Sequence, residues 1–330
     1  MRARHTGRQP RCARSHTLSC SRALSMSNRL AAVMLAAGAS LISLTGILVR
    51  FADVPATVSA FWRMLFGGGI LALALLPAGV WRRVRRSDWL WMLLPAAGMA
   101  ADLALWHRSI HGIGPGLATL LTNFQVFFMA LAGVLFYRER LGPRFLAGAV
   151  LAFGGTWLLV GADWSAFAPA YRTGVWLGLL SGVAYTVYLL GFREAQRRRR
   201  PALDAGAWLA VNSLLCALLL AGLALAEGAP LGIPDPRSLV ALLSLGLVGQ
   251  CLGWMLIVRA MPQLPASLVG LLLLLQPALA FVLDVLLFER ATRAGEWLGL
   301  ALALAGIFVG SVRLGLGKAH SAADSEGPQP

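Results

Sequence analysis

A long apolar segment that occurs twice constrains the fold of this chain more than any other feature of its sequence. Residues 115–141 read PGLATLLTNFQVFFMALAGVLFYRERL, and residues 265–291 read PASLVGLLLLLQPALAFVLDVLLFERA. Both begin with proline, end close to a Glu-Arg pair, and are long enough to cross the roughly 30 Å of hydrocarbon in a bilayer. The segment after each also repeats, with Gly148, Ala152 and Gly155 matching Gly299, Ala303 and Gly306. A repeat of this length predicts a duplicated membrane bundle.

The composition excludes a soluble globular protein. The 330 residues are 58% hydrophobic and 13% charged, whereas soluble domains carry roughly 45–50% apolar and about 25% charged residues. The long stretches are apolar on all sides and lack period-two alternation, which indicates helices and not the strands of a membrane barrel. We therefore expect an all-α polytopic membrane protein with ten transmembrane helices, near residues 30–49, 56–79, 89–107, 114–136, 143–162, 174–192, 205–226, 238–258, 264–287 and 296–313.

The distribution of arginine predicts the orientation in the membrane. A net charge of +15 would suggest nucleic acid in a soluble chain, but here the arginines lie in short loops between apolar stretches, so no nucleic-acid partner is expected. With a cytoplasmic N-terminus, the inner loops hold thirteen Lys and Arg residues and the outer loops hold six. The positive-inside rule then places both termini in the cytoplasm and the chain in the inner, or plasma, membrane.

The two repeats are expected to have opposite orientations, because each contains an odd number of helices, five. We assign residues 29–162 to the first five-helix repeat and residues 174–314 to the second. Residues 1–28 are rich in Arg and Ser and contain no acid. Such a segment cannot bury a core, so we expect a disordered basic N-terminal tail there, and a second disordered tail at residues 315–330.

Ionisable residues inside the predicted helices indicate a functional site, since each costs on the order of 2.5–3.5 kcal/mol at the centre of a membrane. Arg63 lies seven residues into the second helix and Asp102 five residues before the end of the third, which places both ~8–10 Å from the outer face. At these depths the two side chains can pair. The arginine fork would then either bind a substrate carboxylate or only fix one helix against the other. Asp284, close to the end of the ninth helix, is expected to reach water.

Uncharged polar side chains cluster near the middle of the predicted helices. Amides and phenols there can orient a polar solute in an apolar cavity, although each is also a common partner for hydrogen bonds between helices. Pro277 removes one backbone donor and frees a carbonyl one turn back, which predicts a cavity-lining break in the ninth helix. Besides Arg63 and Asp102, the candidate cavity residues are Asn123, Gln125, Tyr185, Tyr188, Gln250, Trp254 and Gln276.

No metal or cofactor site is expected from the sequence. His107 and His111 are four residues apart, but we interpret them as residues of the membrane interface, with Trp106 as an aromatic anchor. The four cysteines form no C-x-x-C pair, so a thiolate metal site is not indicated. A nucleotide-binding P-loop and the common hydrolase motifs do not occur. An ATP-driven pump is therefore excluded, and an enzyme is not expected.

Two motifs make the sequence resemble the EamA-type (RhaT-like) branch of the drug/metabolite transporter superfamily over about residues 30–314. They are SAFWRML at residues 59–65 and the repeated helix with its Glu-Arg end. The resemblance implies two inverted five-helix repeats and secondary transport of small metabolites, often export, by alternating access. It also implies that Arg63, Glu139 and Glu289 match commonly shared positions, the two acids at the gates. Where the family's fourth helix usually has proline, this chain has Gln125-Val126, while Pro277 keeps the proline in the second copy.

These observations predict a secondary-active transporter, an exporter of a small metabolite or drug-like solute that works by alternating access within the lipid bilayer. Asp102 is the candidate carrier of a coupled proton, with Arg63 beside it, and a homodimer is a candidate assembly. A facilitator without ion coupling is the alternative within transport. An integral membrane enzyme or a scaffold without transport activity is the alternative outside it.

Overall fold

The computed structural model describes residues 28–138, 141–160, 164–198, 203–290 and 292–311. Within these ranges every regular element is a helix, and ten helical spans are long and apolar enough to cross a membrane. The predicted all-α class is therefore confirmed. The first repeat contains α1 (Asn28–Phe51), α2 (Ala56–Ala74), the short 3₁₀ turn η1 (Val80–Arg83), α3 (Arg86–Ile113), α4 (Pro115–Thr122), α5 (Gln125–Tyr137) and α6 (Pro143–Val160).

The second repeat has the same number of membrane spans, two of which are interrupted. Its elements are α7 (Pro169–Arg198), α8 (Ala205–Ala226), α9 (Pro236–Ser244), the π-helical segment η2 (Leu245–Gly253), α10 (Trp254–Ala260), the 3₁₀ turn η3 (Met261–Gln263), α11 (Ala266–Leu273), α12 (Leu275–Leu287) and α13 (Ala294–Ser311). In this repeat α9, η2 and α10 together form one span, and α11 with α12 forms another, just as α4 with α5 does in the first repeat.

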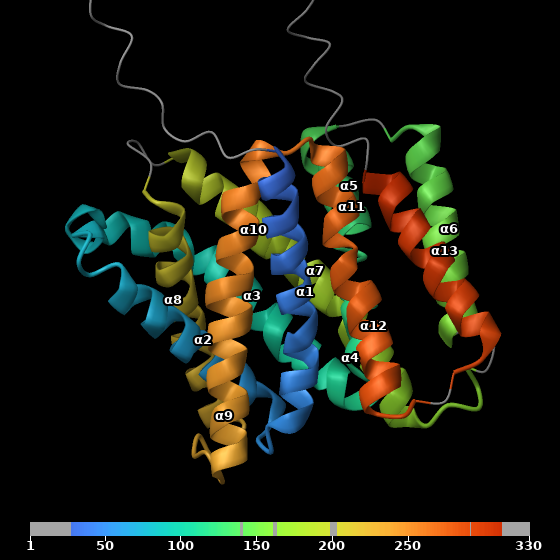
Figure 1. The fold of residues 1–330 in the computed structure, drawn as a ribbon, viewed down its shortest axis with the longest axis horizontal. Coiled ribbons are helices and arrows are strands. Elements are labelled where there is room, and N and C mark those ends of the chain that lie inside the picture. The colour runs from blue at the N-terminus through green and yellow to red at the C-terminus, as the bar shows by residue number, and fades with distance from the viewer. Residues whose placement is uncertain (1–27, 139–140, 161–163, 199–202, 291, 312–330) are drawn as a thin grey trace, which may run out of the picture.

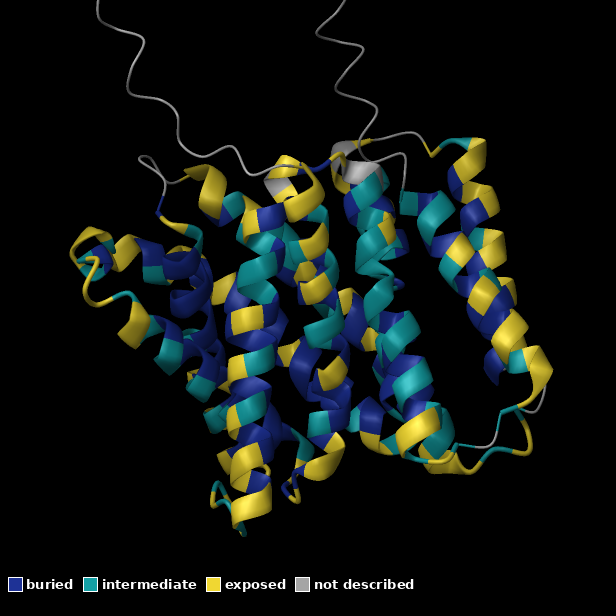
Figure 2. Cartoon of the chain, in the orientation of Figure 1, coloured by how far each residue is buried: buried dark blue, intermediate teal, exposed yellow. Residues whose placement is uncertain are grey.

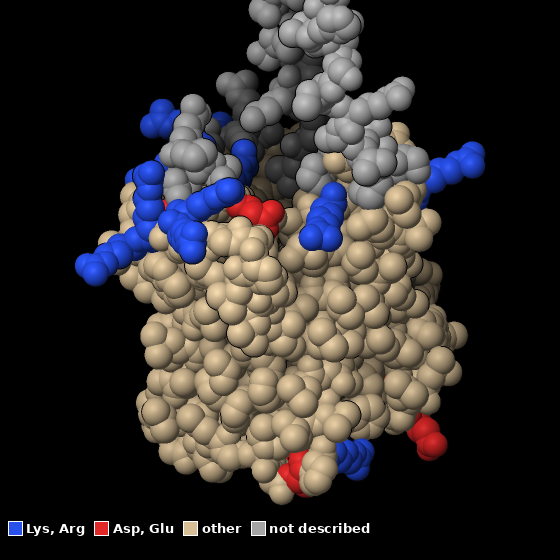
Figure 3. Space-filling view, turned by 60° about the vertical axis from the view of Figure 1, so that its left-hand side comes forward, with Lys and Arg blue, Asp and Glu red and all other residues tan. Residues whose placement is uncertain are grey.

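Helix α1 begins and helix α13 ends at the same end of the bundle (Figure 1). We call this the terminal end and the opposite one the distal end. Lys and Arg side chains gather at the terminal end, and a broad belt without charged side chains lies below them on the face drawn in Figure 3. Large apolar side chains such as Leu94, Val150 and Trp157 are exposed on the outside of the bundle, as expected where lipid is the solvent.

The packing of the helices follows the inverted duplication. Helix α2 packs along α8, and α6 packs along α13, so equivalent helices of the two repeats face each other. Helix α3 packs along α7, and the counterpart of this contact joins α1 to the α9–η2–α10 span. Pairings that recur in this way are expected of two copies related by a twofold axis in the membrane plane. The predicted pair of inverted five-helix repeats is confirmed.

Glycine residues allow the closest of these contacts. A Cβ atom added at Gly155 of α6 would overlap the backbone of Ala303 in α13, and one added at Gly306 of α13 would overlap the backbone of Ala152 in α6. The α6–α13 pair lies at one edge of the bundle, and many of its residues are exposed (Figure 2). Lipid gives no hydrophobic drive for helix association, so close backbone approach at small residues is what holds such a pair together.

The fourth and ninth spans are both interrupted at the same point of the repeat. Asn123 and Phe124 separate α4 from α5, and Leu274 separates α11 from α12. At both points backbone N–H groups donate to carbonyls three residues back, as from Phe124 to Leu121 (3.0 Å) and from Leu274 to Leu271 (3.2 Å). Pro277 therefore does not mark the only break, because the first copy breaks without a proline. There the amide of Asn123 donates to the Thr119 carbonyl at 2.8 Å.

Candidate functional site

A cavity of about 280 Å³ lies between the two repeats. Its walls come from α1 to α5 of the first repeat and from α7, α10, η3, α11 and α12 of the second. The apolar and sulfur-containing lining includes Ile42, Met99, Leu103, Leu189, Ile257, Met261 and Leu273, and the aromatic or polar lining includes Thr45, Arg63, Asp102, Trp106, Thr119, Thr122, Asn123, Gln125, Tyr185, Trp254 and Gln276. An apolar chamber with a few convergent polar groups is the usual form of a small-molecule site.

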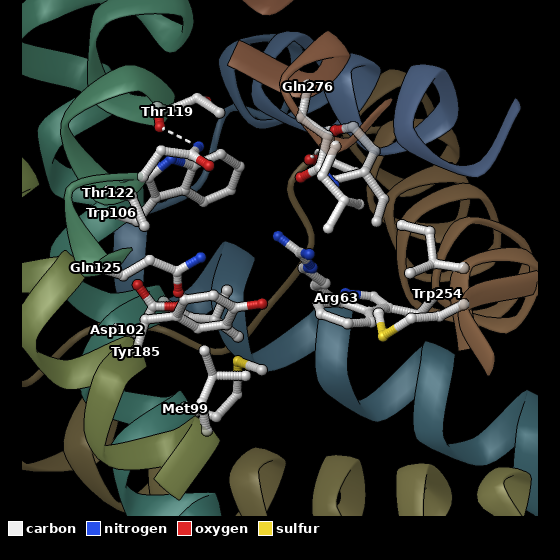
Figure 4. Close-up of a pocket in the computed structure, with 18 residues that line it drawn as sticks. Arg63, Met99, Asp102, Trp106, Thr119, Thr122, Gln125, Tyr185, Trp254 and Gln276 are labelled. Carbon is white, nitrogen blue, oxygen red and sulfur yellow. Dashed lines mark hydrogen bonds between the residues drawn. The ribbon is translucent and has the colours of Figure 1, made fainter. Parts of the chain in front are cut away.

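Arg63 projects from α2 into this cavity, between Trp254 and Gln276 in the view of Figure 4. Only 5% of the residue is exposed, and its Nε atom is buried without a hydrogen-bond partner. Its guanidinium carbon lies 5.5 Å from the centre of the Trp106 ring. Burying a guanidinium without a carboxylate partner costs free energy. An anionic or polar group of a ligand would offset this cost, so Arg63 is available for ligand binding.

Asp102 lies deeper in the membrane than its sequence position suggested. Helix α3 continues to Ile113, so Asp102 is eleven residues from its end, a distance of ~16 Å along the axis. The Asp102 Oδ1 atom accepts a hydrogen bond of 2.5 Å from the Ser181 hydroxyl of α7. Among the ion pairs between described residues, none joins Asp102 to Arg63, and the two side chains lie on opposite sides of the cavity (Figure 4). The predicted direct pair is therefore wrong.

The structure brings seven of the nine predicted cavity residues to one chamber. Two lie elsewhere. Tyr188 is 3% exposed and stacks on Tyr185, with ring centres 5.5 Å apart. Gln250 is fully buried in η2, where its amide donates to the Ser213 hydroxyl at 2.9 Å. The seven lining residues are Arg63, Asp102, Asn123, Gln125, Tyr185, Trp254 and Gln276.

His107 and Trp106 are not residues of the membrane interface. His107 is fully buried, and its Nδ1 atom lies 2.5 Å from the Ser59 hydroxyl of α2. Trp106 is 8% exposed and lines the cavity. The interpretation from sequence failed because α3 extends past both residues to Ile113, so they lie inside the bundle. No group of three or more His, Cys, Asp or Glu residues suited to a metal occurs among the described residues.

Residues of α4 and α12 close the cavity at the distal end. The Asp284 carboxylate of α12 accepts a hydrogen bond from the Gly116 N–H of α4 at 3.3 Å, and an Arg290 nitrogen lies 3.6 Å from the same oxygen. Asp284 is 3% exposed, so the expectation that it reaches water is wrong. Gly114, with φ of +85°, brings the chain so close that a Cβ atom there would overlap the Asp284 carboxylate.

The terminal end lacks this closure over the described residues. Whereas α4 packs closely on α12, no comparable packing joins α5 to α11, the equivalent pair at the terminal end. The cavity lining extends in that direction to Met261, which is 38% exposed. The chamber is thus closed distally and extends toward the terminal end.

The three residues predicted to act at the gates lie in different environments or outside the described residues. Glu139 lies outside the described residues. Glu289 is exposed beyond the end of α12, with φ of +49°. Pro277 is buried in the first turn of α12, where the missing N–H leaves the carbonyl of Leu273, a cavity-lining residue, without its usual helical partner.

Comparison with known proteins gives one consistent result. The sequence model of the EamA-like transporter family matches residues 29–161 and 172–312. The chain is 27% identical over 274 residues to the uncharacterized transporter YwfM of Bacillus subtilis (strain 168), a match that covers 80% of this chain and 88% of that protein. An uncharacterized transporter of Haemophilus influenzae is 31% identical over 108 residues, which are 32% of this chain and 35% of that protein. A solved crystal structure matches 86% of this chain and 97% of its own length, with a TM-score of 0.60 and 21% identity.

Proposed function

Because the chain belongs to the EamA-like transporter family, we propose that it is a secondary-active transporter that exports a small metabolite or drug-like solute by alternating access. The observation that carries the proposal is the cavity between the inverted repeats, which is closed at the distal end and extends toward the terminal end. A volume of about 280 Å³ is at the lower limit for ligand pockets, which favours a small solute over a large drug.

The direction of transport follows from the orientation proposed for the bundle. The Arg-rich terminal end (Figure 3) would lie in the cytoplasm of the inner, or plasma, membrane according to the positive-inside rule. The cavity would then be loaded from the cytoplasm. In the second state the two repeats exchange roles, so α5 packs on α11 while α4 separates from α12. The interruptions at Asn123–Phe124 and at Leu274 supply the hinges for this exchange.

Arg63 and Asp102 divide the recognition of the solute between them. Arg63 offers a desolvated fork for an anionic or strongly polar group, and Asp102, across the cavity (Figure 4), offers a carboxylate for a proton or a donor group of the solute. Transport would be coupled to protons if Asp102 exchanges a proton in each cycle. If pH-dependent flux in Asp102→Asn matches that of the wild type, Asp102 is not the carrier.

The test compares solutes released by living cells. Cells that express the wild type, Arg63→Ala or Arg144→Ala are grown in the same medium, and their intracellular and extracellular solutes are measured by mass spectrometry. Arg144 is exposed at the start of α6 and serves as the matched control for loss of one arginine. We expect one solute class to accumulate outside with the wild type and with Arg144→Ala but not with Arg63→Ala. Identical pools in the wild type and in cells without the protein would contradict the proposal.

A further inference from the structure

A chain of buried hydroxyl groups leads from Asp102 to the interruption between α4 and α5. The Ser181 hydroxyl of α7, fully buried, lies 2.5 Å from Asp102 Oδ1 and 2.8 Å from the Thr122 hydroxyl. The Thr122 hydroxyl lies in turn 3.0 Å from the carbonyl of Ala118. Thr122 is the last residue of α4, directly before the interruption at Asn123. Two spans of the first repeat, α3 and α4, and one span of the second, α7, therefore meet through two hydroxyl groups.

The number of hydrogen atoms available in this series of hydrogen bonds couples the Asp102 carboxylate to the Ala118 carbonyl. Each hydroxyl has one hydrogen to donate, and an ionised carboxylate can only accept. When Asp102 is ionised, Ser181 donates to it, so only Thr122 can donate between the two hydroxyls, and it then gives up its bond to the Ala118 carbonyl. When Asp102 is neutral and donates to Ser181, the Ser181 hydrogen turns to Thr122, and the Thr122 hydrogen returns to Ala118. The hydrogen bonding of the last turn of α4 thus depends on the charge of Asp102.

Helix α7 also contacts the interruption directly. A Cβ atom added at Gly182 would lie 3.0 Å from the Thr122 carbonyl oxygen and 3.3 Å from the Gln125 nitrogen. The Thr186 hydroxyl lies 3.5 Å from the Gln125 carbonyl oxygen. Ser181 and its neighbours on α7 therefore contact residues on both sides of Asn123 and Phe124. A substitution at Ser181 is expected to alter the contacts at this interruption.

The second repeat does not reproduce this arrangement. In the register of the repeat, Thr122 corresponds to Leu272, which has no hydroxyl group and cannot take part in such a chain. The hydrogen bonding at Leu274 therefore cannot depend on the charge of a carboxylate through such a series of hydroxyl groups. Among the described residues, buried hydroxyl groups thus join Asp102 to the first interruption and not to its counterpart in the second repeat.

We propose that Ser181 and Thr122 are positioning residues that transmit the charge state of Asp102 to the α4–α5 hinge. This inference rests on the proposed function, since it takes the interruption as a hinge that moves during transport. Loss or gain of the Asp102 charge would then favour one arrangement of α5 relative to α11. The solute site and the gate at the terminal end would be coupled through α3, α7 and α4.

The experiment measures the gate directly in the full-length protein. Spin labels are placed at Leu135→Cys in α5 and Leu271→Cys in α11, both exposed positions, after replacement of the native cysteines. Distances between the labels are measured by double electron–electron resonance spectroscopy in lipid nanodiscs of phosphatidylethanolamine and phosphatidylglycerol. Asp102→Asn serves as the neutral form of the acid, and its effect on the two distance populations is compared between backgrounds.

We expect Asp102→Asn to change the population ratio by about ten-fold or more, the magnitude typical of a hydrogen bond to a charged group. In Ser181→Ala or Thr122→Val the same change should alter the ratio less than about two-fold. Thr122→Ser, which keeps the hydroxyl, should restore the full effect. Thr156→Val is the matched control, because Thr156 in α6 makes the same hydroxyl bond to a carbonyl four residues back, at 2.9 Å to Ala152, and lies outside the cavity lining.

Two results would overturn the inference. One is an Asp102→Asn effect of equal size with and without Ser181 and Thr122, and the other is no effect of Asp102→Asn in the wild-type background. Folding is checked for each variant by size-exclusion chromatography, and Thr122→Val and Ser181→Ala test the connection at separate points. The export measurement described above decides the proposed function by itself, so export that continues without this coupling would reject the inference alone.

Discussion

Removal of the Asp284 carboxylate is expected to open the distal end of the cavity. The carboxylate accepts from the Gly116 N–H at 3.3 Å and lies 3.6 Å from an Arg290 nitrogen. A hydrogen bond to a charged group contributes about 1.5–3 kcal/mol, and both distances are long, so we take the lower limit for Asp284→Leu. Arg290 would keep Glu296 as a partner at 3.1 Å, so no unpaired charge is added. About 1.5 kcal/mol corresponds to a roughly ten-fold change in the open population.

The assay uses the rate at which a cavity cysteine reacts from the distal side. Asn123→Cys is introduced in a cysteine-free chain, and a membrane-impermeant maleimide is added to vesicles with the distal end outward. The rate is proportional to the fraction of open molecules, so Asp284→Leu should react about ten times faster. Asp284→Asn retains an acceptor for Gly116, and we expect about a three-fold increase, because a neutral hydrogen bond has roughly half the strength of a charged one.

Asp235→Asn provides the control for this experiment. Asp235 caps α9 by accepting from the Ser238 N–H at 2.9 Å, and α9 packs on α1, α2 and η2. Its substitution should leave the reaction rate unchanged. An unchanged rate in Asp284→Leu, or an equal increase in Asp235→Asn, would refute the argument that Asp284 holds the distal end closed.

Three further outcomes follow from the packing and the charges. Arg63→Lys keeps the charge but loses the planar fork, so export by cells should fall at least about ten-fold while the amount of folded protein stays constant. Gly155→Leu should lower the melting temperature in detergent, with an overpacking cost of about 1–3 kcal/mol. Gly154→Leu should not lower it, because the space at Gly154 is open. An equal decrease in both variants would contradict the α6–α13 contact. Glu227→Gln should destabilise the protein by less than about 1 kcal/mol in chemical unfolding, because its bridge to Arg108 is one-third exposed.

The repeat made the fold predictable, and the tertiary contacts made parts of the site unpredictable. The paired segments at residues 115–141 and 265–291 determine ten spans in two inverted halves without any knowledge of the packing. The predicted depth of Asp102 was wrong because Arg108 and His111 suggested that the helix ends near them, whereas α3 continues to Ile113. An arginine near a helix end can remain inside the span when a partner such as Glu227 lies within reach.

Individual cavity residues depend on which way a helix faces. Tyr185 and Tyr188 are three residues apart on α7 and indistinguishable by type, yet only Tyr185 reaches the cavity. Ser181 was missed altogether, because a single serine in an apolar helix has no motif, and its importance comes from Asp102 and Thr122 on two other spans. His107 was misassigned because α3 continues past it to Ile113, so the imidazole meets Ser59 of α2 inside the bundle.

The π-helical winding of η2 determines which wall the cavity receives from the eighth span. A π-helix uses more residues per turn than an α-helix, so the orientation of α10, and with it Trp254 and Ile257, depends on the number of residues between 245 and 253. If the segment rewound as an ordinary α-helix with the same number of residues, each residue would turn the chain by about 100°, which is more than in a π-helix, so α10 would rotate about its axis. The solute preference of this protein could then be changed by the winding of one segment, with every cavity side chain still present in the sequence.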